Sequence, residues 1–194
     1  MSIWFGDNVP DDGDLRLCGD LTGKRAIELG IAPTPNAITM ALGGAKAMVL
    51  DPSADRIADL RAAAESSDVR VECHRGELAD LGFATSGSVD VVVAAHTLAA
   101  IDDLPRLLRQ VHRVLKPGAS FVVASTHPVA AMFEEAGGPV RFPYGARAAT
   151  FGELSMAFER TNFHIDVVHE LADRRQRNPD FPAVLVVRAR KQGV

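Results

Sequence analysis

The chain has 194 residues, 47% of them hydrophobic, which is enough apolar material for the core of a single domain over residues 1–194. Its 21 basic and 25 acidic residues leave a net charge of −4, so the composition gives no reason to expect nucleic acid as a partner. The two cysteines lack the spacing of a zinc site, and no apolar run reaches the ~20 residues that span a bilayer. The first residues are polar and acidic, unlike a signal peptide. We therefore expect a cytoplasmic protein without metal or membrane partners.

Residues 1–14 are predicted to form an N-terminal arm, because Pro10, Gly13 and four aspartates oppose regular structure. Trp4 and Phe5 are the apolar anchor of this arm. Packing of their rings on the edge of the core is the favoured interpretation, and folding of the arm across a ligand cleft is the alternative. A short helix is expected over residues 15–21.

Residues 24–53 have the pattern of a strand, a tight loop, a helix and a second strand. The apolar run Arg25–Leu29 predicts the first strand, and Gly30 lets the chain turn without a side chain in the way. Asn36 is a candidate N-cap for a helix that ends at the glycine pair 43–44.

The second strand of this segment, Ala47–Leu50, ends in Asp51. Nucleotide-binding α/β folds place an acid at the end of the second strand, about 20 residues after the first glycine. Its carboxylate accepts two O–H donors, which suits a pair of ribose hydroxyls. Asp51 is therefore a candidate ribose ligand.

The rest of the chain alternates between helical and strand periodicity. Alternation of polar and apolar residues over 69–74 is typical of a strand near a sheet edge, whereas the apolar run 89–95 is typical of a strand buried on both faces. The last two strands are separated only by a polar loop, which predicts an antiparallel hairpin. The predicted elements are a helix capped by Ser53, strands at 69–74 and 89–95, a helix at 102–115 that Asp102 or Asp103 caps and Gly118 ends, a strand at 119–125, a helix at 150–162, and strands at 164–171 and 183–190.

Two histidines follow strands that are predicted to be neighbours. His96 comes directly after the run 89–95, and His127 follows the run 119–125 at a distance of one residue. Ligands of open parallel sheets bind beyond the carboxyl ends of the strands, so both side chains are candidates to accept a proton or contact a substrate. A structural role for His96, with its ring bonded to a loop carbonyl, is the alternative that the sequence leaves open.

Residues 128–150 form a long segment with little periodicity, which is typical of a functional lid. Phe133, Phe142 and Tyr144 within it are candidates to line a pocket for an apolar or aromatic substrate. Local packing under the loop is an equally open interpretation of these three rings.

Four motifs occur in a suggestive order: ELG at 28–30, DPS at 51–53, GEL at 76–78 and HRVLKPGA at 112–119. In the order and spacing of these motifs, nearly the whole chain resembles the class I S-adenosylmethionine-dependent methyltransferases. The resemblance implies an α/β fold with a Rossmann-like, doubly wound, mostly parallel seven-stranded sheet and an antiparallel C-terminal hairpin strand.

The resemblance also implies S-adenosylmethionine as the cofactor and a small molecule as the methyl acceptor. His127 would be the first candidate for a base if the acceptor must lose a proton. The implied cofactor contacts are Glu28, Gly30, Ile31 and Ala32 for the methionine part, Asp51 for the ribose, Pro52 and Leu78 against the adenine, Glu77 for the adenine amino group, and Ala95 and His96 at the methyl-bearing end.

The loop after the first strand differs from the pattern of that family, which has glycines at alternate positions. Ala32 and Thr34 occupy two of the three places, and Pro33 and Pro35 intervene. Each proline removes an N–H donor, so one alternative is a methyltransferase-like binding or regulatory protein without catalysis. An NAD(P)-dependent oxidoreductase is a less favoured alternative, because its own glycine fingerprint is also incomplete. No local motif in the sequence identifies the acceptor atom or the oligomeric state.

Overall fold

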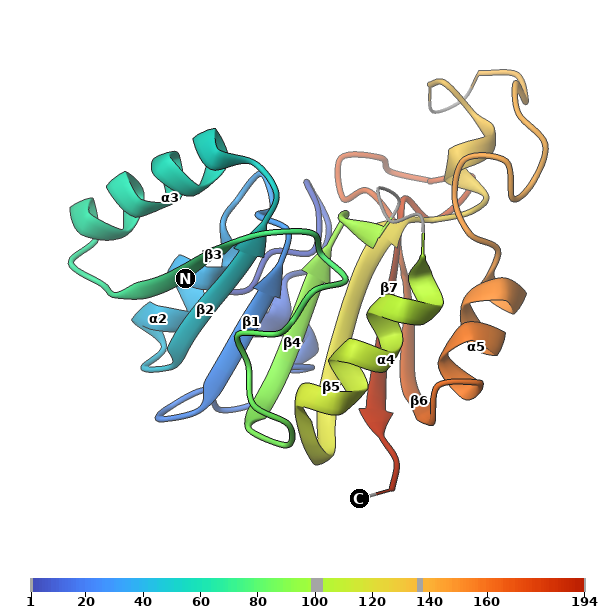
Figure 1. Cartoon of the computed structure of the whole chain (residues 1–194). Helices are drawn as coiled ribbons and strands as arrows, with labels where there is room; N and C mark the ends of the chain where they lie inside the picture. Colours follow the sequence, from blue (N-terminus) through green and yellow to red (C-terminus); the bar gives the residue numbers. More distant parts are fainter. Residues whose placement is uncertain (1, 99–102, 136–137, 194) are drawn as a thin grey trace.

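The computed structural model describes residues 2–98, 103–135 and 138–193, and in it all seven strands belong to one sheet (Figure 1). The strands are β1 (Arg25–Leu29), β2 (Lys46–Asp51), β3 (Val71–Arg75), β4 (Val89–Ala95), β5 (Leu115–Thr126), β6 (Phe163–Leu171) and β7 (Val184–Lys191). The α-helices are α1 (Asp12–Leu15), α2 (Asn36–Leu42), α3 (Ala54–Ser66), α4 (Leu104–Val114) and α5 (Phe151–Glu159), and a short 3-10 turn covers Ala130–Met132.

The strand order is β3-β2-β1-β4-β5-β7-β6. The pairs among β1 to β5 are parallel, whereas β7 is antiparallel to both of its neighbours, β5 and β6. This confirms the predicted mostly parallel sheet with an antiparallel C-terminal strand, and β3 lies at one edge as expected. The carboxyl ends of β1, β2, β4 and β5 meet along one edge of the sheet, which we call the carboxyl edge.

Each face of the sheet carries its own layer. We call one the α4 face, because α4, α5 and the β3–β4 loop pack on it around Leu107, Val111 and Phe158 (Figure 1). The opposite face carries the N-terminal arm, α2 and α3, with Phe5 and Met40 wholly buried against it. None of the helices in the described part of the chain is long and apolar enough to cross a membrane.

Two predictions for the first half of the chain are wrong. A helix forms at Asp12–Leu15 rather than at 15–21, because the Asp11 side chain accepts a hydrogen bond from the Gly13 amide and caps it. Asn36 is the first residue of α2 and not its cap, since its side chain bonds the backbone of Trp4 instead. The second error comes from a contact with the N-terminal arm that no local pattern reveals.

The helix predicted at 102–115 begins at Leu104 and ends at Val114. Asp103 caps it by accepting from the Arg106 amide at 2.8 Å, as predicted, while Asp102 lies outside the described residues. The chain passes directly into β5, because Leu115 already pairs with Val89 of β4. Gly118, with φ of +72°, therefore lies inside the strand and does not end the helix.

Candidate functional site

Glu28 shapes the loop between β1 and α2. Its side chain is fully buried, and its Oε1 accepts hydrogen bonds from the amides of Ala32 and Asn36, both at 3.0 Å. Its Oε2 accepts from the amide of Ala37 at 2.7 Å. A carboxylate from the end of β1 thus satisfies the free donors at the start of α2, which is the task of a cap.

Two opposing effects act on the pKa of Glu28. Burial raises the pKa of this carboxyl from 4.5 to about 7, while the three amide donors lower it. The structure gives Glu28 the role of holding the loop in shape, because both of its oxygens are already engaged by the backbone of residues 32–37.

Asp51 ends β2 directly beside this loop. Its Oδ2 accepts from the Ile31 amide and its Oδ1 from the Ser53 amide, both at 2.8 Å. The Nη1 of Arg56 lies 3.3 Å from Oδ2, with 47% of the Arg56 side chain exposed against 1% of the Asp51 side chain. Asp51 is therefore covered, and Arg56 is the half-exposed group whose displacement would open it to another donor.

Gly30 makes the closest approach of the loop to β4. A Cβ at this residue would lie 2.4 Å from Cγ2 of Thr97, and its φ of +70° is in the region that favours glycine. Thr97 in turn donates its hydroxyl to the Leu29 carbonyl at 2.6 Å. The ends of β1 and β4 are thereby locked together, and Thr97 is a site residue that the sequence reasoning missed.

Three successive residues of the loop use their amide donors and leave their carbonyl acceptors free. The amides of Gly30, Ile31 and Ala32 donate to the Leu50 carbonyl, Asp51 and Glu28, respectively. The carbonyl oxygens of the same three residues accept no hydrogen bond from any residue that the structure describes. Pro33 is exposed, so its ring does not fill the inside of the bend. An edge of free carbonyls suits a positively charged ligand group.

His96 stands at the carboxyl end of β4 with φ of +59°, a conformation that is uncommon outside glycine. Its Nε2 lies 2.8 Å from the carbonyl oxygen of Phe5. A carbonyl only accepts, so Nε2 carries the proton and Nδ1 of the neutral ring is an acceptor. Nδ1 makes no hydrogen bond within the described residues. The bond to a loop carbonyl that the sequence left open is present, and it leaves one nitrogen available.

His127 has no such freedom. It is 5% exposed, its Nε2 lies 2.8 Å from Oε1 of Glu170, and its Nδ1 accepts from the Val129 amide at 3.1 Å. Both ring nitrogens are engaged in tying the end of β5 to β6. His127, the first candidate base from the sequence, therefore has no ring nitrogen free, whereas His96 keeps one.

The N-terminal arm packs on the core and also contacts residues at the carboxyl edge. Phe5 is fully buried in the core, as the favoured interpretation expects. The backbone of Trp4 pairs with the Asn36 side chain through bonds of 2.7 and 3.0 Å, and its ring centroid lies 5.4 Å from that of His96. The arm therefore also crosses the carboxyl edge between the β1–α2 loop and β4.

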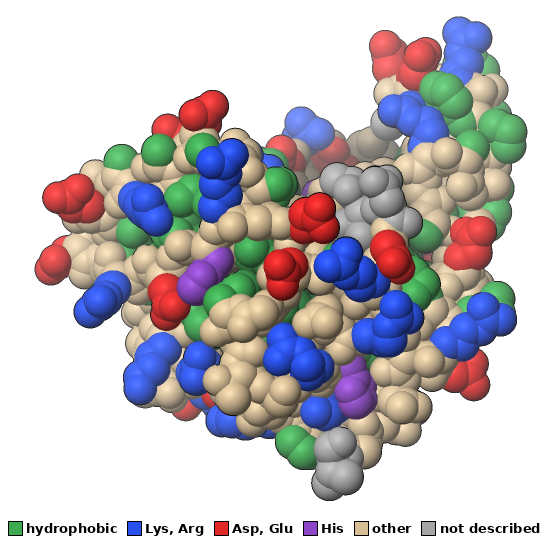
Figure 2. Space-filling model, viewed as in Figure 1, with side chains coloured by type: hydrophobic (Ala, Val, Ile, Leu, Met, Phe, Trp, Pro, Cys, Tyr) green, Lys and Arg blue, Asp and Glu red, His purple; other side chains and the backbone are tan. Residues whose placement is uncertain are grey.

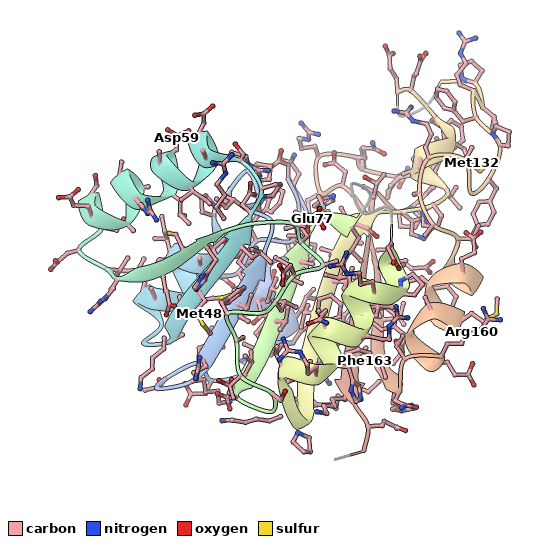
Figure 3. The ribbon with its side chains drawn as sticks, viewed as in Figure 1. Met48, Asp59, Glu77, Met132, Arg160 and Phe163 are labelled. Atoms are coloured by element: carbon pink, nitrogen blue, oxygen red, sulfur yellow. The ribbon has the colours of Figure 1, made fainter. Side chains whose placement is uncertain are left out.

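Residues after β3 occupy the other side of this edge. Glu77 points outward at the carboxyl edge, with 79% of its side chain exposed and Arg106 at 3.7 Å (Figure 3). Leu78 packs partly buried against the core of the α4 face, while Pro52 is exposed beyond Asp51 and Ala95 is buried at the end of β4. Pro52, Glu77 and Leu78 thus remain accessible to a ligand that lies across the strand ends.

A cavity of about 360 Å³ opens beside His96. Its polar walls are Ser125 and Thr126 at the end of β5, and Leu98, Leu104 and Leu154 supply apolar walls. The segment 145–149 closes it and contributes Arg147, which among the described lining residues is the one cation and faces no acid. This volume is in the range of small-molecule sites, about 300–1,000 Å³.

The three aromatic rings of the segment 128–150 do not line that cavity. Phe133 stacks on Phe181 with ring centroids 4.5 Å apart, and Phe142 lies under the guanidinium of Arg147 at 4.4 Å. Tyr144 is 49% exposed. The structure therefore supports local packing of Phe133 and Phe142 but not of Tyr144, and Arg147, which lies against Phe142, lines the cavity instead.

Comparisons with known proteins relate the chain to methyltransferases. A family model described as "Methyltransferase domain" matches residues 27–123. The ubiquinone biosynthesis O-methyltransferase of Sodalis glossinidius is 32% identical over 104 residues, which cover 54% of this chain and 42% of that protein. The protein of the same name from Xanthomonas oryzae pv. oryzae is 26% identical over 114 residues, covering 59% and 48%. The chain spans about half the length of these curated relatives.

Solved structures share the fold over nearly the whole chain. An S-adenosylmethionine-dependent methyltransferase from Mesorhizobium loti superposes with a TM-score of 0.75 at 24% identity, covering 92% of this chain and 96% of that one. A putative S-adenosylmethionine-dependent methyltransferase from Listeria monocytogenes gives a TM-score of 0.75 at 18% identity, covering 92% and 95%. With the family model matching half of its residues and this fold around the site, the chain belongs to the methyltransferase-domain family.

Proposed function

We propose that this protein transfers the methyl group of S-adenosylmethionine to a small-molecule acceptor bound in the cavity beside His96. The observation that carries the proposal is that the β1–α2 loop and the cavity lie next to each other at the end of β4. The β1–α2 loop packs against β4 through Gly30 and Thr97, and His96, the residue before Thr97, lines the cavity. A cofactor on the loop and an acceptor in the cavity would therefore meet at the end of β4.

The chemical groups at the carboxyl edge suit the groups of this cofactor. The free carbonyls of residues 30–32 suit its ammonium group and sulfonium charge, and the carboxylate of Asp51 suits the two ribose hydroxyls. Pro52 and Leu78 would pack against the adenine, and Glu77 would accept from its amino group. The chemistry that the cofactor supplies when bound is an electrophilic methyl group.

The task of the chain is then to align that group with a nucleophile and to exclude water. His96 would accept the proton of an acceptor hydroxyl at Nδ1, because its Nε2 is fixed as a donor by the Phe5 carbonyl. Trp4 and the segment 145–149 would cover the two sides of the edge. Arg147 would favour acceptors that are neutral or negatively charged over cationic ones, since the described cavity walls carry no acid.

Specific observations also favour a second candidate, a methyltransferase-like binding protein without turnover. Asp51 is fully buried, and its Oδ2 is already shared by the Ile31 amide and Arg56. Binding of the cofactor would have to displace Arg56. The amides of Gly30, Ile31 and Ala32 already donate to Leu50, Asp51 and Glu28, so these three residues offer no spare donor to a carboxylate.

A turnover assay separates the two candidates. The protein is incubated with methyl-labelled S-adenosylmethionine and a panel of small phenols and hydroxy acids, and S-adenosylhomocysteine is quantified. The proposal expects its formation with at least one acceptor and a strong reduction by His96→Gln, which keeps a hydrogen bond to Phe5 but offers no basic nitrogen. Binding of the cofactor without any acceptor-dependent product would favour the non-catalytic protein.

A further inference from the structure

A second groove lies far from the carboxyl edge, at the amino ends of β1, β2 and β3. Its volume is about 540 Å³, and the described residues that line it are Arg25, Ala45, Lys46, Ala47, Met48, Arg70, Val71 and Glu72. The groove exists because the chain runs from β3 to β4 without a helix, so this corner of the α4 face lacks the cover that parallel sheets usually have (Figure 1).

The cations of this groove form one row across three strands. Arg25 of β1 is the direct register partner of Lys46 of β2. Arg70 directly precedes Val71, the partner of Ala47, and so continues the same row onto β3. Neighbouring strands are about 4.8 Å apart, so the backbones of the three residues lie within about 10 Å of one another across the sheet.

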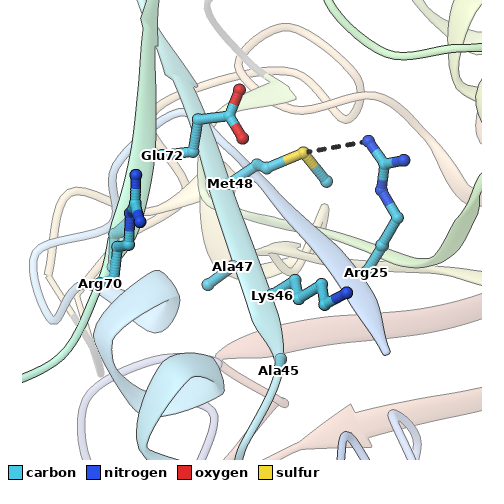
Figure 4. Close-up of a pocket in the computed structure, with 8 residues that line it drawn as sticks. Arg25, Ala45, Lys46, Ala47, Met48, Arg70 and Glu72 are labelled. Carbon is cyan, nitrogen blue, oxygen red and sulfur yellow. Dashed lines mark hydrogen bonds between the residues drawn. The ribbon is translucent and has the colours of Figure 1, made fainter. Parts of the chain in front are cut away.

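All three side chains emerge on the same face. Arg25 alternates with Ile27 and Leu29, and Lys46 alternates with Met48 and Leu50, all of which pack in the core of the α4 face. Arg70 has the parity of His74, which stacks on Phe83 at that face. Figure 4 shows Arg70 across the groove from Arg25, with Lys46 between them.

No carboxylate neutralises this row. Among residues 2–98, 103–135 and 138–193, no acid lies within 4.0 Å of the charged nitrogens of Arg25, Lys46 or Arg70. The Oε1 of Glu72, the one acid that lines the groove, lies 2.9 Å from His74 instead. The described contact of the Arg25 guanidinium is the sulfur of Met48 at 3.9 Å, a weak acceptor.

Asp90 of β4 is the acid next to Arg25 in the strand pairing, because Ala26 pairs with Val91. Its Oδ1 lies 2.6 Å from Nζ of Lys116, and its Oδ2 accepts from the backbone amide of Arg25. It therefore fixes the start of β1 without pairing with the Arg25 guanidinium. Like charges on adjacent strands repel, so the row costs stability in the absence of a counter-charge.

We propose that this groove binds a phosphate-bearing small molecule. Two arginines and a lysine in one row offer the forked and point-charge donors that phosphate oxygens accept. A volume of about 540 Å³ suits a compact ligand. A nucleic acid would need a longer basic surface, whereas acidic and basic side chains are interspersed over this face (Figure 2).

Calorimetric titration of the full chain with inorganic pyrophosphate, at constant ionic strength, tests the proposal. We expect saturable binding to one site, weakened at least about tenfold by the double substitution Lys46→Gln and Arg70→Gln. Arg109→Gln, which removes an exposed cation from α4, should leave the affinity within about twofold. Removing a charge from the row should also raise the midpoint of thermal unfolding by about 1 °C, so the variants are expected to fold.

Three results would overturn the proposal. The first is the absence of saturable pyrophosphate binding, and the second is equal binding by the parent protein and the double variant. The third is tighter binding of a short single-stranded oligonucleotide that depends on Lys46 and Arg70, because the groove would then belong to a nucleic-acid surface. None of these results bears on the carboxyl edge, whose residues the substitutions do not touch.

Discussion

The side chain of Glu28 reaches from the end of β1 to the Ala37 amide at 2.7 Å and thereby caps α2 from another element. The loop of residues 30–35 is held between these two points. Its shape depends on a buried carboxylate, in a loop where Ala32 and Thr34 stand at two of the three glycine places of the family pattern and two prolines intervene. The predictions below follow from this loop and the residues around it.

Glu28→Gln should lower the free energy of unfolding by about 1–3 kcal/mol, because the amide offers one acceptor where three amides now donate. Urea denaturation at pH 7 measures the effect. Glu65→Gln, on the exposed side of α3, is the matched control and should change the stability by less than about 0.5 kcal/mol. Equal stability of both variants would show that Glu28 does not hold the loop.

The same substitution should alter the pH dependence of stability. The folded pKa of Glu28 is raised from 4.5 to about 7, so between these values the folded protein binds more protons than the unfolded chain. The contribution of Glu28 is fully present below pH 4.5 and decreases by about 3 kcal/mol as the pH rises through 7. The difference in unfolding free energy between parent and Glu28→Gln should therefore change over this window, and a constant difference would contradict the shift.

Gly30→Ala should destabilise the protein by more than the conformational cost of a left-handed alanine, about 1–2 kcal/mol. Its Cβ would meet Thr97 at 2.4 Å, whereas Gly19, with a similar φ of +65°, has nothing within 4 Å. Gly19→Ala is thus a control for the backbone conformation alone. Thermal unfolding of both variants checks the prediction, which fails if the two substitutions cost the same.

Arg56→Ala should strengthen the binding of S-adenosylhomocysteine by about two- to fivefold. Arg56 lies 3.3 Å from Oδ2 of Asp51, in the position that a ribose hydroxyl would take. Because the Arg56 side chain is 47% exposed, its removal should change stability by less than about 1 kcal/mol. Arg61→Ala on the same helix is the control, and weaker binding by Arg56→Ala would make Arg56 a ligand contact.

His96→Gln should lower kcat by about 10²–10⁴-fold for acceptors that must lose a proton. His127→Gln should instead act on stability, because the ring bridges Glu170 and the Val129 amide. Comparing kcat with the unfolding midpoint for the two variants separates the roles. The assignment is reversed if His127→Gln lowers kcat at unchanged stability and His96→Gln leaves kcat unchanged.

The strands of the sheet follow closely from the sequence, because their apolar runs are local signals. Residues 25–29 and 89–95 were predicted as strands and form β1 and β4 with those bounds. The acids at 28 and 51 could be placed at strand ends for the same reason. What they bond could not, since the partners of Glu28 lie in the backbone of a loop whose shape depends on the fold.

Several expectations from the sequence could not take account of contacts between residues distant in sequence. Asn36 is a residue type that favours N-caps, yet its side chain bonds the backbone of Trp4. His127 has the position of a catalytic residue, yet Glu170, 43 residues away, holds it. The cation row at the amino ends of the strands likewise depends on strand register, which no single stretch of sequence encodes.

The most direct test of the account is calorimetric titration of S-adenosylhomocysteine into the parent protein, Asp51→Asn and Asp55→Asn. Asp51 is the buried carboxylate beside the loop, while Asp55 is an exposed acid in the first turn of α3. We expect one binding site in the parent, an affinity at least about tenfold weaker in Asp51→Asn, and no change in Asp55→Asn. Absence of binding by the folded parent protein, or equal affinity in all three, would contradict it.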